Sequence, residues 1–240
     1  MNEKRFKEVA EALLKWYEKH GRDFLPWRGA KDPNAVLVAE FLLQRTRAET
    51  IQKIYHQFLS NFGAIKKLAS TSPEKLQCLF RKLGLFYRGE RLIQVSKEIT
   101  EKYGGEVPCD MEKLLKLHGV GVYMASAVLN FGCGVPTPVV DKNVLRVLNR
   151  LAGITKESQA RRFIEGLYRH GDHVRIAYAL IDLGALVCKE RPNCNACPLC
   201  KLCPKYPLKK AEWRMLRKVI AKNGRVELKE QPVYSSKKKN

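Results

Sequence analysis

Apolar residues recur three or four positions apart along most of the chain, which is the pattern of amphipathic and buried α-helices. Local signals mark some helix ends: Gly21 follows the first pattern, and Asp32-Pro33 combines a capping residue with a proline suited to a first turn. No convincing strand precedes about residue 225 and no internal repeat is present, so the fold is predicted to be all-α. The predicted helices are 5–20, 33–43, 48–62, a short one from Ser72, 88–103, 111–117, 123–131, 143–151, 155–168, 174–187 and 209–223, with one candidate strand over 224–230.

Two glycines bracket a single valine between two of these helices, in the segment Leu117-His118-Gly119-Val120-Gly121-Val122-Tyr123. Glycine permits positive φ and a close approach by another backbone. The first N–H groups of the following helix lack intrahelical partners, and with the helix dipole they form an anion site that suits a DNA phosphate. Taken alone, a Gly-x-Gly is more typical of an ordinary tight turn between packed helices.

A proline-rich segment and an aspartate follow the second of these helices. The prolines in Gly134-Val135-Pro136-Thr137-Pro138-Val139-Val140 exclude a regular helix. Asp141 then opens the apolar helix 143–151, where an aspartate is usually an N-cap and is held as an anion. A fixed carboxylate one short loop from a phosphate-binding hairpin also suits the stabilisation of a developing cation.

Glu40 is the one charged residue in the apolar run 35–43. A buried carboxylate is costly unless it is paired, protonated or lines a cavity. It is therefore a satisfied core acid, an exit toward solvent or a functional group, and its isolation favours the functional interpretation.

The chain has 45 lysines and arginines against 24 acidic residues, for a formal net charge of +21 at pH 7. Such an excess favours a polyanion as partner, because binding releases counterions. An acidic membrane surface is the competing partner. The sequence has no run of about eighteen apolar residues, no signal peptide and no lipidation motif, so we expect a soluble, cytoplasmic, nucleoid-associated monomer that binds no membrane.

Five of the eight cysteines fall between residues 188 and 203. Four of them follow the spacing Cys-x5-Cys-x2-Cys-x5-Cys, with Cys200 inside the last gap. Such a group favours a soft metal, and by spacing alone structural zinc and an iron–sulfur cluster are equally consistent. The scattered cysteines are interpreted as buried or unreactive free thiols rather than as a disulfide framework, and they are Cys78, Cys109 and Cys133.

The glycine hairpin, followed by Val139-Val140-Asp141-Lys142-Asn143-Val144-Leu145-Arg146-Val147, resembles the helix-hairpin-helix DNA glycosylases. In that family a hairpin precedes a Gly/Pro-rich loop and an essential Asp, and the likeness extends from about Phe6 to Pro204. The resemblance implies two helical lobes, with double-stranded DNA across the cleft between them and a mismatched or damaged base flipped into a pocket. The implied parts are a helical barrel with the hairpin over 30–135, a cluster-bearing lobe over 1–29 and 136–207, and a basic C-terminal extension over 208–240.

The resemblance also implies roles for particular residues. Asp141 would stabilise the oxocarbenium-like sugar and orient or deprotonate the water. Tyr123 would line the pocket against the base, and Glu40 would bind the polar edge of the base or the water. Gln44 matches the polar wedge that fills the gap left by a flipped base, and Arg45 stands where MutY adenine glycosylases have a second Gln. The other implied DNA contacts are Leu117, Gly119, Val120, Gly121 and Asn143.

A large branch of this family carries a 4Fe–4S cluster on a C-terminal cysteine loop, which implies such a cluster here. The implied ligands are Cys188, Cys194, Cys197 and Cys203. The first gap in the family is usually six residues and here it is five, which leaves Cys200 as a spare candidate ligand. Asp182, a lone acid in the apolar run 179–184, matches a family position that supports packing and the cluster.

Tyr123 separates the branches of this family by their chemistry. Endonuclease III-like lyases have there the Lys that forms a Schiff base, MutY proteins usually have Ser, and archaeal thymine–DNA mismatch glycosylases of the Mig type have Tyr. The resemblance thus implies a monofunctional glycosylase acting on thymine or uracil opposite guanine. The features that carry this implication are Tyr123, Arg45, Leu85-Phe86 in place of Tyr-Tyr, and the absent MutT-like domain. The alternatives are an adenine glycosylase acting opposite guanine or 8-oxoguanine, and a non-catalytic cysteine-cluster DNA-binding protein, which would need neither Asp141 nor Glu40.

Overall fold

The computed structural model describes residues 3–76 and 86–204, and every regular element in this part of the chain is a helix, as predicted. None of these helices combines the length and apolar composition needed to span a membrane. The predicted helix 209–223 and strand 224–230 lie outside the described residues. The elements are α1 (Glu3–His20), α2 (Pro33–Leu43), α3 (Ala48–Phe62), α4 (Ile65–Ala69), α6 (Phe86–Tyr103), α7 (Met111–Leu115), α8 (Val122–Ala127), η1 (Val128–Gly132), α9 (Lys142–Ala152), α10 (Glu157–Tyr168), α11 (His173–Asp182), η2 (Leu183–Val187), η3 (Cys194–Ala196) and η4 (Cys200–Leu202).

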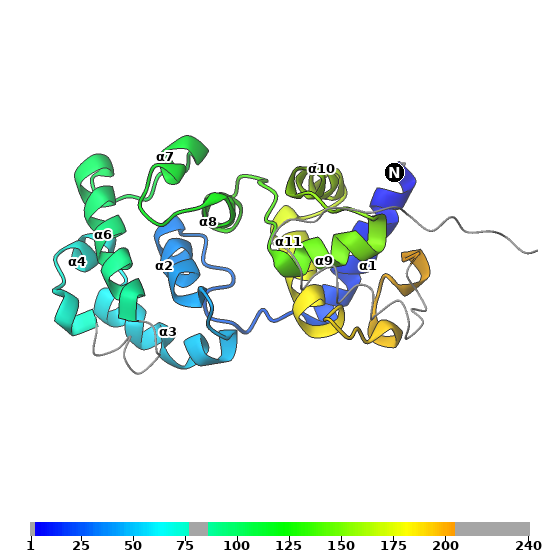
Figure 1. Ribbon diagram of the computed structural model, residues 1–240, viewed down its shortest axis with the longest axis horizontal. Coiled ribbons are helices and arrows are strands. Elements are labelled where there is room, and N and C mark those ends of the chain that lie inside the picture. Colours follow the sequence, from blue (N-terminus) through cyan, green and yellow to red (C-terminus); the bar gives the residue numbers. More distant parts are fainter. Residues whose placement is uncertain (1–2, 77–85, 205–240) are drawn as a thin grey trace, which may run out of the picture.

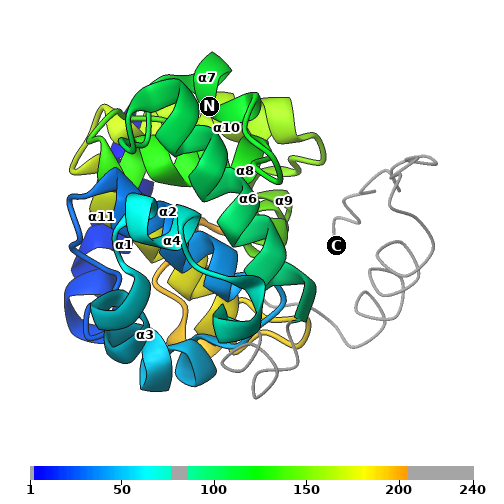
Figure 2. The same cartoon turned by 90° about the vertical axis from the view of Figure 1, so that its left-hand side faces the viewer.

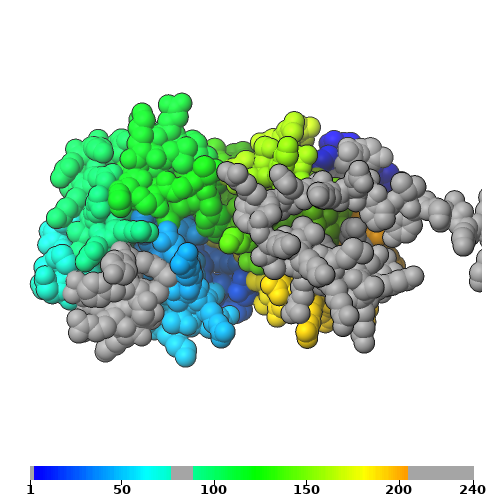
Figure 3. All heavy atoms as spheres, viewed as in Figure 1, coloured from blue at the N-terminus to red at the C-terminus, as the bar shows by residue number. Residues whose placement is uncertain are grey.

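The helices form two groups that lie side by side along the long axis of the molecule (Figure 1). The first group contains α2, α3, α4, α6, α7 and α8, and the second contains α1, α9, α10, α11 and the cysteine loop. Although α1 begins the chain, it packs against α10 and α11. Figure 2 looks along the long axis with α3, α4 and α6 in front, and Figure 3 shows the two groups as one continuous surface. The arrangement agrees with the two-lobe architecture implied by the resemblance.

Aspartate side chains fix the starts of four helices, because each accepts a hydrogen bond from a backbone N–H of the first turn. These N-caps are Asp32, Asp110, Asp141 and Asp172. The start predicted at Asp32-Pro33 is therefore confirmed. At the other end of α9, Gly153 adopts the left-handed conformation with φ of 69°. The helix that carries Asp141 is thus capped at both ends.

Two helical runs end in π-helical turns that periodicity did not predict: η1 continues α8, and η2 continues α11. A π-turn adds one residue to a helical turn and so rotates the side chains that follow. At the end of η1, a β-carbon on Gly132 would lie only 2.6 Å from the Cα of Pro33. This close approach seats the hairpin helix directly against the start of α2.

A buried ion cluster joins the loop after α1 to α11. Asp182 is fully buried, and its carboxylate accepts hydrogen bonds from the Arg28 guanidinium at 2.6 and 2.8 Å and from the Arg22 side chain at 2.8 Å. The Arg28 guanidinium lies 4.2 Å from the centroid of the Tyr178 ring, which stacks on Phe131. Asp182 therefore has the structural role in packing predicted for it, since it fixes the crossover between the two groups of helices.

The interpretation of Cys109 and Cys133 as free thiols is wrong, because the two residues form a disulfide. Cys109 precedes the N-cap of α7, and Cys133 follows η1. The hairpin folds these two helical segments back on each other, which brings together cysteines 24 residues apart in sequence. The bond closes the segment that contains the whole hairpin.

Candidate active site

A cleft of about 640 Å³ contains the predicted catalytic residues. The end of α2, the glycine hairpin and the start of α9 form its walls, so both groups of helices contribute to it. Folding thus brings Glu40 together with Tyr123 and Asp141, although about one hundred residues separate the first from the last. The lining residues are Glu40, Leu43, Gln44, Arg45, Gly119, Gly121, Tyr123, Met124, Asp141, Lys142 and Asn143.

The hairpin presents backbone rather than side chains to the cleft. Gly119 has a φ of 76°, which favours glycine, and Gly121 is the N-cap of α8 without a side chain to cap it. Both glycines are exposed, whereas the side chains of Leu117 and Val120 are buried in the core. Of the four predicted DNA contacts in the hairpin, Leu117 and Val120 can therefore offer only backbone groups, and their side chains anchor the turn.

Asp141 is held in one orientation by two hydrogen bonds. One carboxylate oxygen accepts the backbone N–H of Val144 at 2.6 Å, and the other accepts the Asn143 side-chain amide at 3.0 Å. The predicted N-cap is thus confirmed. The capped carboxylate lies at the N-terminal end of α9 and lines the cleft.

Arg146, which sequence reasoning missed, connects Asp141 to the cysteine loop. Its guanidinium donates to the Asn143 Oδ1 at 2.7 Å and to the carbonyl oxygens of Gly184 and Cys188, both at 2.8 Å. The Asn143 amide is therefore shared between Asp141 and Arg146, and it orients the carboxylate. The available signal was a pair of arginines, Arg146 and Arg150, four residues apart on one side of the helix 143–151.

Glu40 lies in the buried part of α2, which excludes an exit toward solvent and leaves a core acid or a functional group. Burial, helped by the charge of Asp141, raises the pKa of Glu40 to about 7, although a hydrogen bond with Tyr123 and the charge of Arg28 act in the opposite direction. Burial and the charges of Glu40 and Asp141 raise the pKa of the Tyr123 phenol well above its usual value, so it remains a hydrogen-bond donor. The cleft thus places a carboxyl that can change protonation near neutral pH beside a capped carboxylate.

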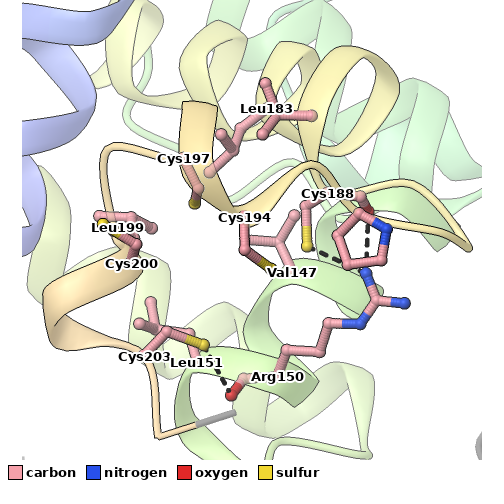
Figure 4. A pocket seen from close by; sticks show the side chains of 12 residues that line it. Val147, Arg150, Leu151, Leu183, Cys188, Cys194, Cys197, Leu199, Cys200 and Cys203 are labelled. Carbon is pink, nitrogen blue, oxygen red and sulfur yellow. Dashed lines mark hydrogen bonds between the residues drawn. The ribbon is translucent and has the colours of Figure 1, made fainter. Parts of the chain in front are cut away.

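The cysteines of the C-terminal loop gather in a pocket bounded by α9 and η2 (Figure 4). In Figure 4 the sulfurs of Cys188, Cys194, Cys197 and Cys203 face a shared space, and Cys200 lies at its edge beside Leu199. All five are free thiols. The remaining walls are mainly apolar and include Val147, Leu151, Leu183, Val187 and Leu199. The donors and the dry walls fit a soft, thiolate-bound metal group.

Two arginines hold the cysteine loop in place through hydrogen bonds. Arg150 is buried and donates to the Cys188 sulfur at 3.2 Å and to the carbonyl oxygen of Lys189 at 2.6 Å. Arg5 of α1 donates to the Leu202 carbonyl oxygen at 3.0 Å. Among the described residues, no group of three or more His, Cys, Asp or Glu side chains is arranged to hold a single metal ion.

A family model described as the HhH-GPD superfamily of base excision DNA repair proteins matches residues 38–169, more than half of the chain. The chain belongs to this superfamily. The matched residues include the end of α2, the hairpin and the start of α9, which are the three walls of the cleft.

Within the superfamily, this chain is 37% identical over 216 residues to a thymine-DNA glycosylase of Aeropyrum pernix, which covers 84% of this chain and 96% of that protein. It is 35% identical to a thymine/uracil-DNA glycosylase of Pyrobaculum aerophilum, over 81% of this chain and 89% of that protein. An adenine DNA glycosylase of Buchnera aphidicola is 32% identical over 82% of this chain, but the match covers only 58% of that protein. The structure of a thermostable thymine-DNA glycosylase aligns with a TM-score of 0.77 and 30% identity, over 85% of this chain and 97% of that chain.

Proposed function

We propose that this HhH-GPD protein is a monofunctional DNA glycosylase that removes thymine or uracil from opposite guanine. The observation that carries the proposal is the arrangement of Glu40, Tyr123 and Asp141 around one cleft beside the hairpin. The thymine and thymine/uracil glycosylases match this chain at 37% and 35% identity, and the adenine glycosylase matches it at 32%. The higher identities favour thymine or uracil over adenine.

Asp141 supplies the electrostatic part of the mechanism. As the bond between base and sugar breaks, positive charge develops on the sugar, and a fixed carboxylate beside it lowers the energy of that state. The bonds from Val144 and Asn143 fix the carboxylate before the substrate arrives, so little reorganisation is needed. The same carboxylate orients the attacking water or accepts its proton.

Glu40 handles the base or the water. With a pKa of about 7, its carboxyl is present in both protonation states near neutral pH and can donate to a carbonyl oxygen of the base or accept from the water. Tyr123 donates its hydroxyl hydrogen to Glu40 and places its ring against the pocket. Because a phenol cannot form a Schiff base, hydrolysis is expected to leave an abasic strand uncut.

DNA binding is proposed to use the hairpin and the positive charge of the chain. The exposed backbone of Gly119 and Gly121 can approach a phosphate closely, and Lys142 is exposed at the rim of the cleft. Gln44 lies at the same rim, where it can occupy the space left by a flipped base.

The test of this function is a panel of duplexes under single-turnover conditions. Thymine and uracil opposite guanine should be released faster than adenine opposite guanine or 8-oxoguanine, with strand cleavage only after alkali or heat and little borohydride-trapped complex. Asp141→Asn, which keeps the cap acceptor but loses the charge, should slow release by at least about a hundredfold while preserving binding. Release of adenine alone would establish the adenine alternative, and binding without release of any base would establish the non-catalytic one.

We also propose that Cys188, Cys194, Cys197 and Cys203 hold a 4Fe–4S cluster. When bound, such a cluster would tie the C-terminal loop to α9 and η2 and support the surface that meets DNA. The thiols face a shared space with mainly apolar walls, and with the family resemblance this soft donor set favours a cluster over a single zinc. Purified protein should be yellow-brown and contain iron and sulfide. Colourless, active protein with one zinc per chain would contradict the proposal.

A further inference from the structure

The turn between α2 and α3 contains Arg45, the one non-glycine residue of the described chain with a positive φ, 53°. This left-handed region disfavours residues with a β-carbon, and glycine or asparagine is the usual solution there. The Thr46 N–H closes the turn by donating to the Leu43 carbonyl oxygen at 3.1 Å. Strain of this kind concentrates where the position of a side chain matters for function.

The Arg45 guanidinium is exposed at the rim of the cleft, beside Gln44. Within residues 3–76 and 86–204 it makes no hydrogen bond and no ion pair. Two other arginines close to the site are occupied, since Arg28 pairs with Asp182 and Arg146 donates to protein acceptors. The planar guanidinium of Arg45 can therefore donate hydrogen bonds from its N–H groups to a ligand in the cleft.

We propose that Arg45 binds the guanine left unpaired in the duplex and thereby selects the base opposite the excised one. The inference rests on the proposed glycosylase function. When thymine enters the cleft beside Glu40 and Tyr123, its former partner loses the hydrogen bonds of O6 and N1, and Arg45 lines the same cleft. Guanine presents two acceptors, O6 and N7, along one edge, and a guanidinium can donate to both at once.

The same contact discriminates against other purines. Adenine carries an amino donor where guanine has O6, so Arg45 would face a donor instead of an acceptor. An oxidised guanine with a hydrogen on N7 loses one of the two acceptors. Because thymine opposite adenine is the normal base pair, an enzyme that removes thymine needs this discrimination to spare undamaged DNA.

The experiment compares wild type with Arg45→Gln on thymine opposite guanine and opposite 7-deazaguanine, which lacks N7 but pairs with thymine in the same way. Wild type should excise thymine about tenfold more slowly opposite 7-deazaguanine than opposite guanine. Arg45→Gln should act on both duplexes at one slow rate. 2-Aminopurine, which lacks O6, is compared with guanine by binding alone, because it forms a stable pair with thymine. The matched control is Arg47→Gln, because Arg47 is exposed in the same turn without lining the cleft, and it should keep the wild-type pattern.

A binding assay on the same duplexes, with a stable abasic analogue in place of thymine, requires no excision. It therefore separates this inference from the proposed function. Loss of the guanine preference in Arg45→Gln binding supports the inference even for an inactive enzyme. If Arg45→Gln instead loses affinity equally for all duplexes, and its slope of log affinity against log salt concentration is smaller by about one, Arg45 contacts a phosphate and the inference is overturned. An unchanged guanine preference overturns it as well. Arg45→Gly suits the positive φ and supplies a folded variant if Arg45→Gln unfolds.

Discussion

At the residue scale, the chemistry of the site comes from what surrounds two carboxyls. Glu40 is buried in α2, and its pKa rises to about 7, while Asp141 is capped by backbone and amide donors at a helix start. Two residues of the same chemical class thus have different surroundings. Burial lets Glu40 change protonation near neutral pH, whereas hydrogen bonds fix the orientation of Asp141 at the cleft.

Replacement of Glu40 by glutamine should make stability less dependent on pH. Because the folded-state pKa of Glu40, about 7, lies above its ordinary value of 4.5, its contribution to stability is complete below pH 4.5 and is lost as the pH rises through 7. Glutamine keeps an acceptor for Tyr123 and never ionises. The advantage of Glu40→Gln in unfolding free energy should therefore grow from pH 5 to about pH 9 and reach roughly 3 kcal/mol. Denaturant unfolding of both proteins at several pH values measures it, and a constant difference would contradict it.

At the element scale, the hairpin segment is fastened at both ends. The Cys109–Cys133 disulfide joins the residue before the α7 cap to the residue after η1, and Gly132 packs tightly against Pro33 of α2. The segment that presents Gly119 and Gly121 to the cleft is therefore constrained independently of the cysteine loop. This constraint reduces the freedom of the unfolded chain as well as the movement of the folded hairpin.

Breaking this disulfide should destabilise the protein. A closed loop of about 25 residues predicts a loss of about 3 kcal/mol in unfolding free energy on the chain-entropy account. Cys109→Ser with Cys133→Ser should show that loss in urea without reductant, and adding a reductant should lower wild-type stability to the same level. Equal stability of wild type with and without reductant, with the bond verified by mass spectrometry, would contradict this expectation.

At the scale of the whole molecule, the two groups of helices meet where η1 packs against α11, with Phe131 stacked on Tyr178. α1 returns to the C-terminal helices, and the Arg22–Arg28–Asp182 cluster fixes the loop that crosses between the groups. The cleft depends on this arrangement, because one wall comes from α9 and the others from α2 and the hairpin. The net charge of +21 also acts at this scale, because the electrostatic attraction to a polyanion comes from the whole protein.

Affinity for undamaged duplex should fall steeply with salt, because the proposed contacts replace counterions at phosphates. Between about 50 and 200 mM salt we expect a loss of about a thousandfold or more. Lys142→Gln should reduce the slope of log affinity against log salt concentration by about one. Lys7→Gln, which removes a partner of Glu11 outside the cleft, should leave that slope unchanged. Fluorescence anisotropy across a salt series measures both, and a flat series would contradict phosphate binding.

The local features of this protein follow from its sequence alone. The helix 48–62 agrees with α3 at both ends, and the N-cap at Asp141 and the turn at Gly119 follow from their own residues. These features depend on periodicity, capping and backbone freedom, which involve residues only a few positions apart. The apolar run around Glu40 likewise predicted burial before any partner was visible.

Which of these features meet depends on how the helices pack in three dimensions. The hydrogen bond between Glu40 and Tyr123, the disulfide between Cys109 and Cys133, and the bonds of Asp182 all join segments distant in sequence. The π-turns also rotate side chains away from the register that periodicity predicts, because each inserts one residue into a turn. Such contacts follow from how the helices pack. Helical periodicity predicts which face of a helix is buried, but it does not predict which other element covers that face.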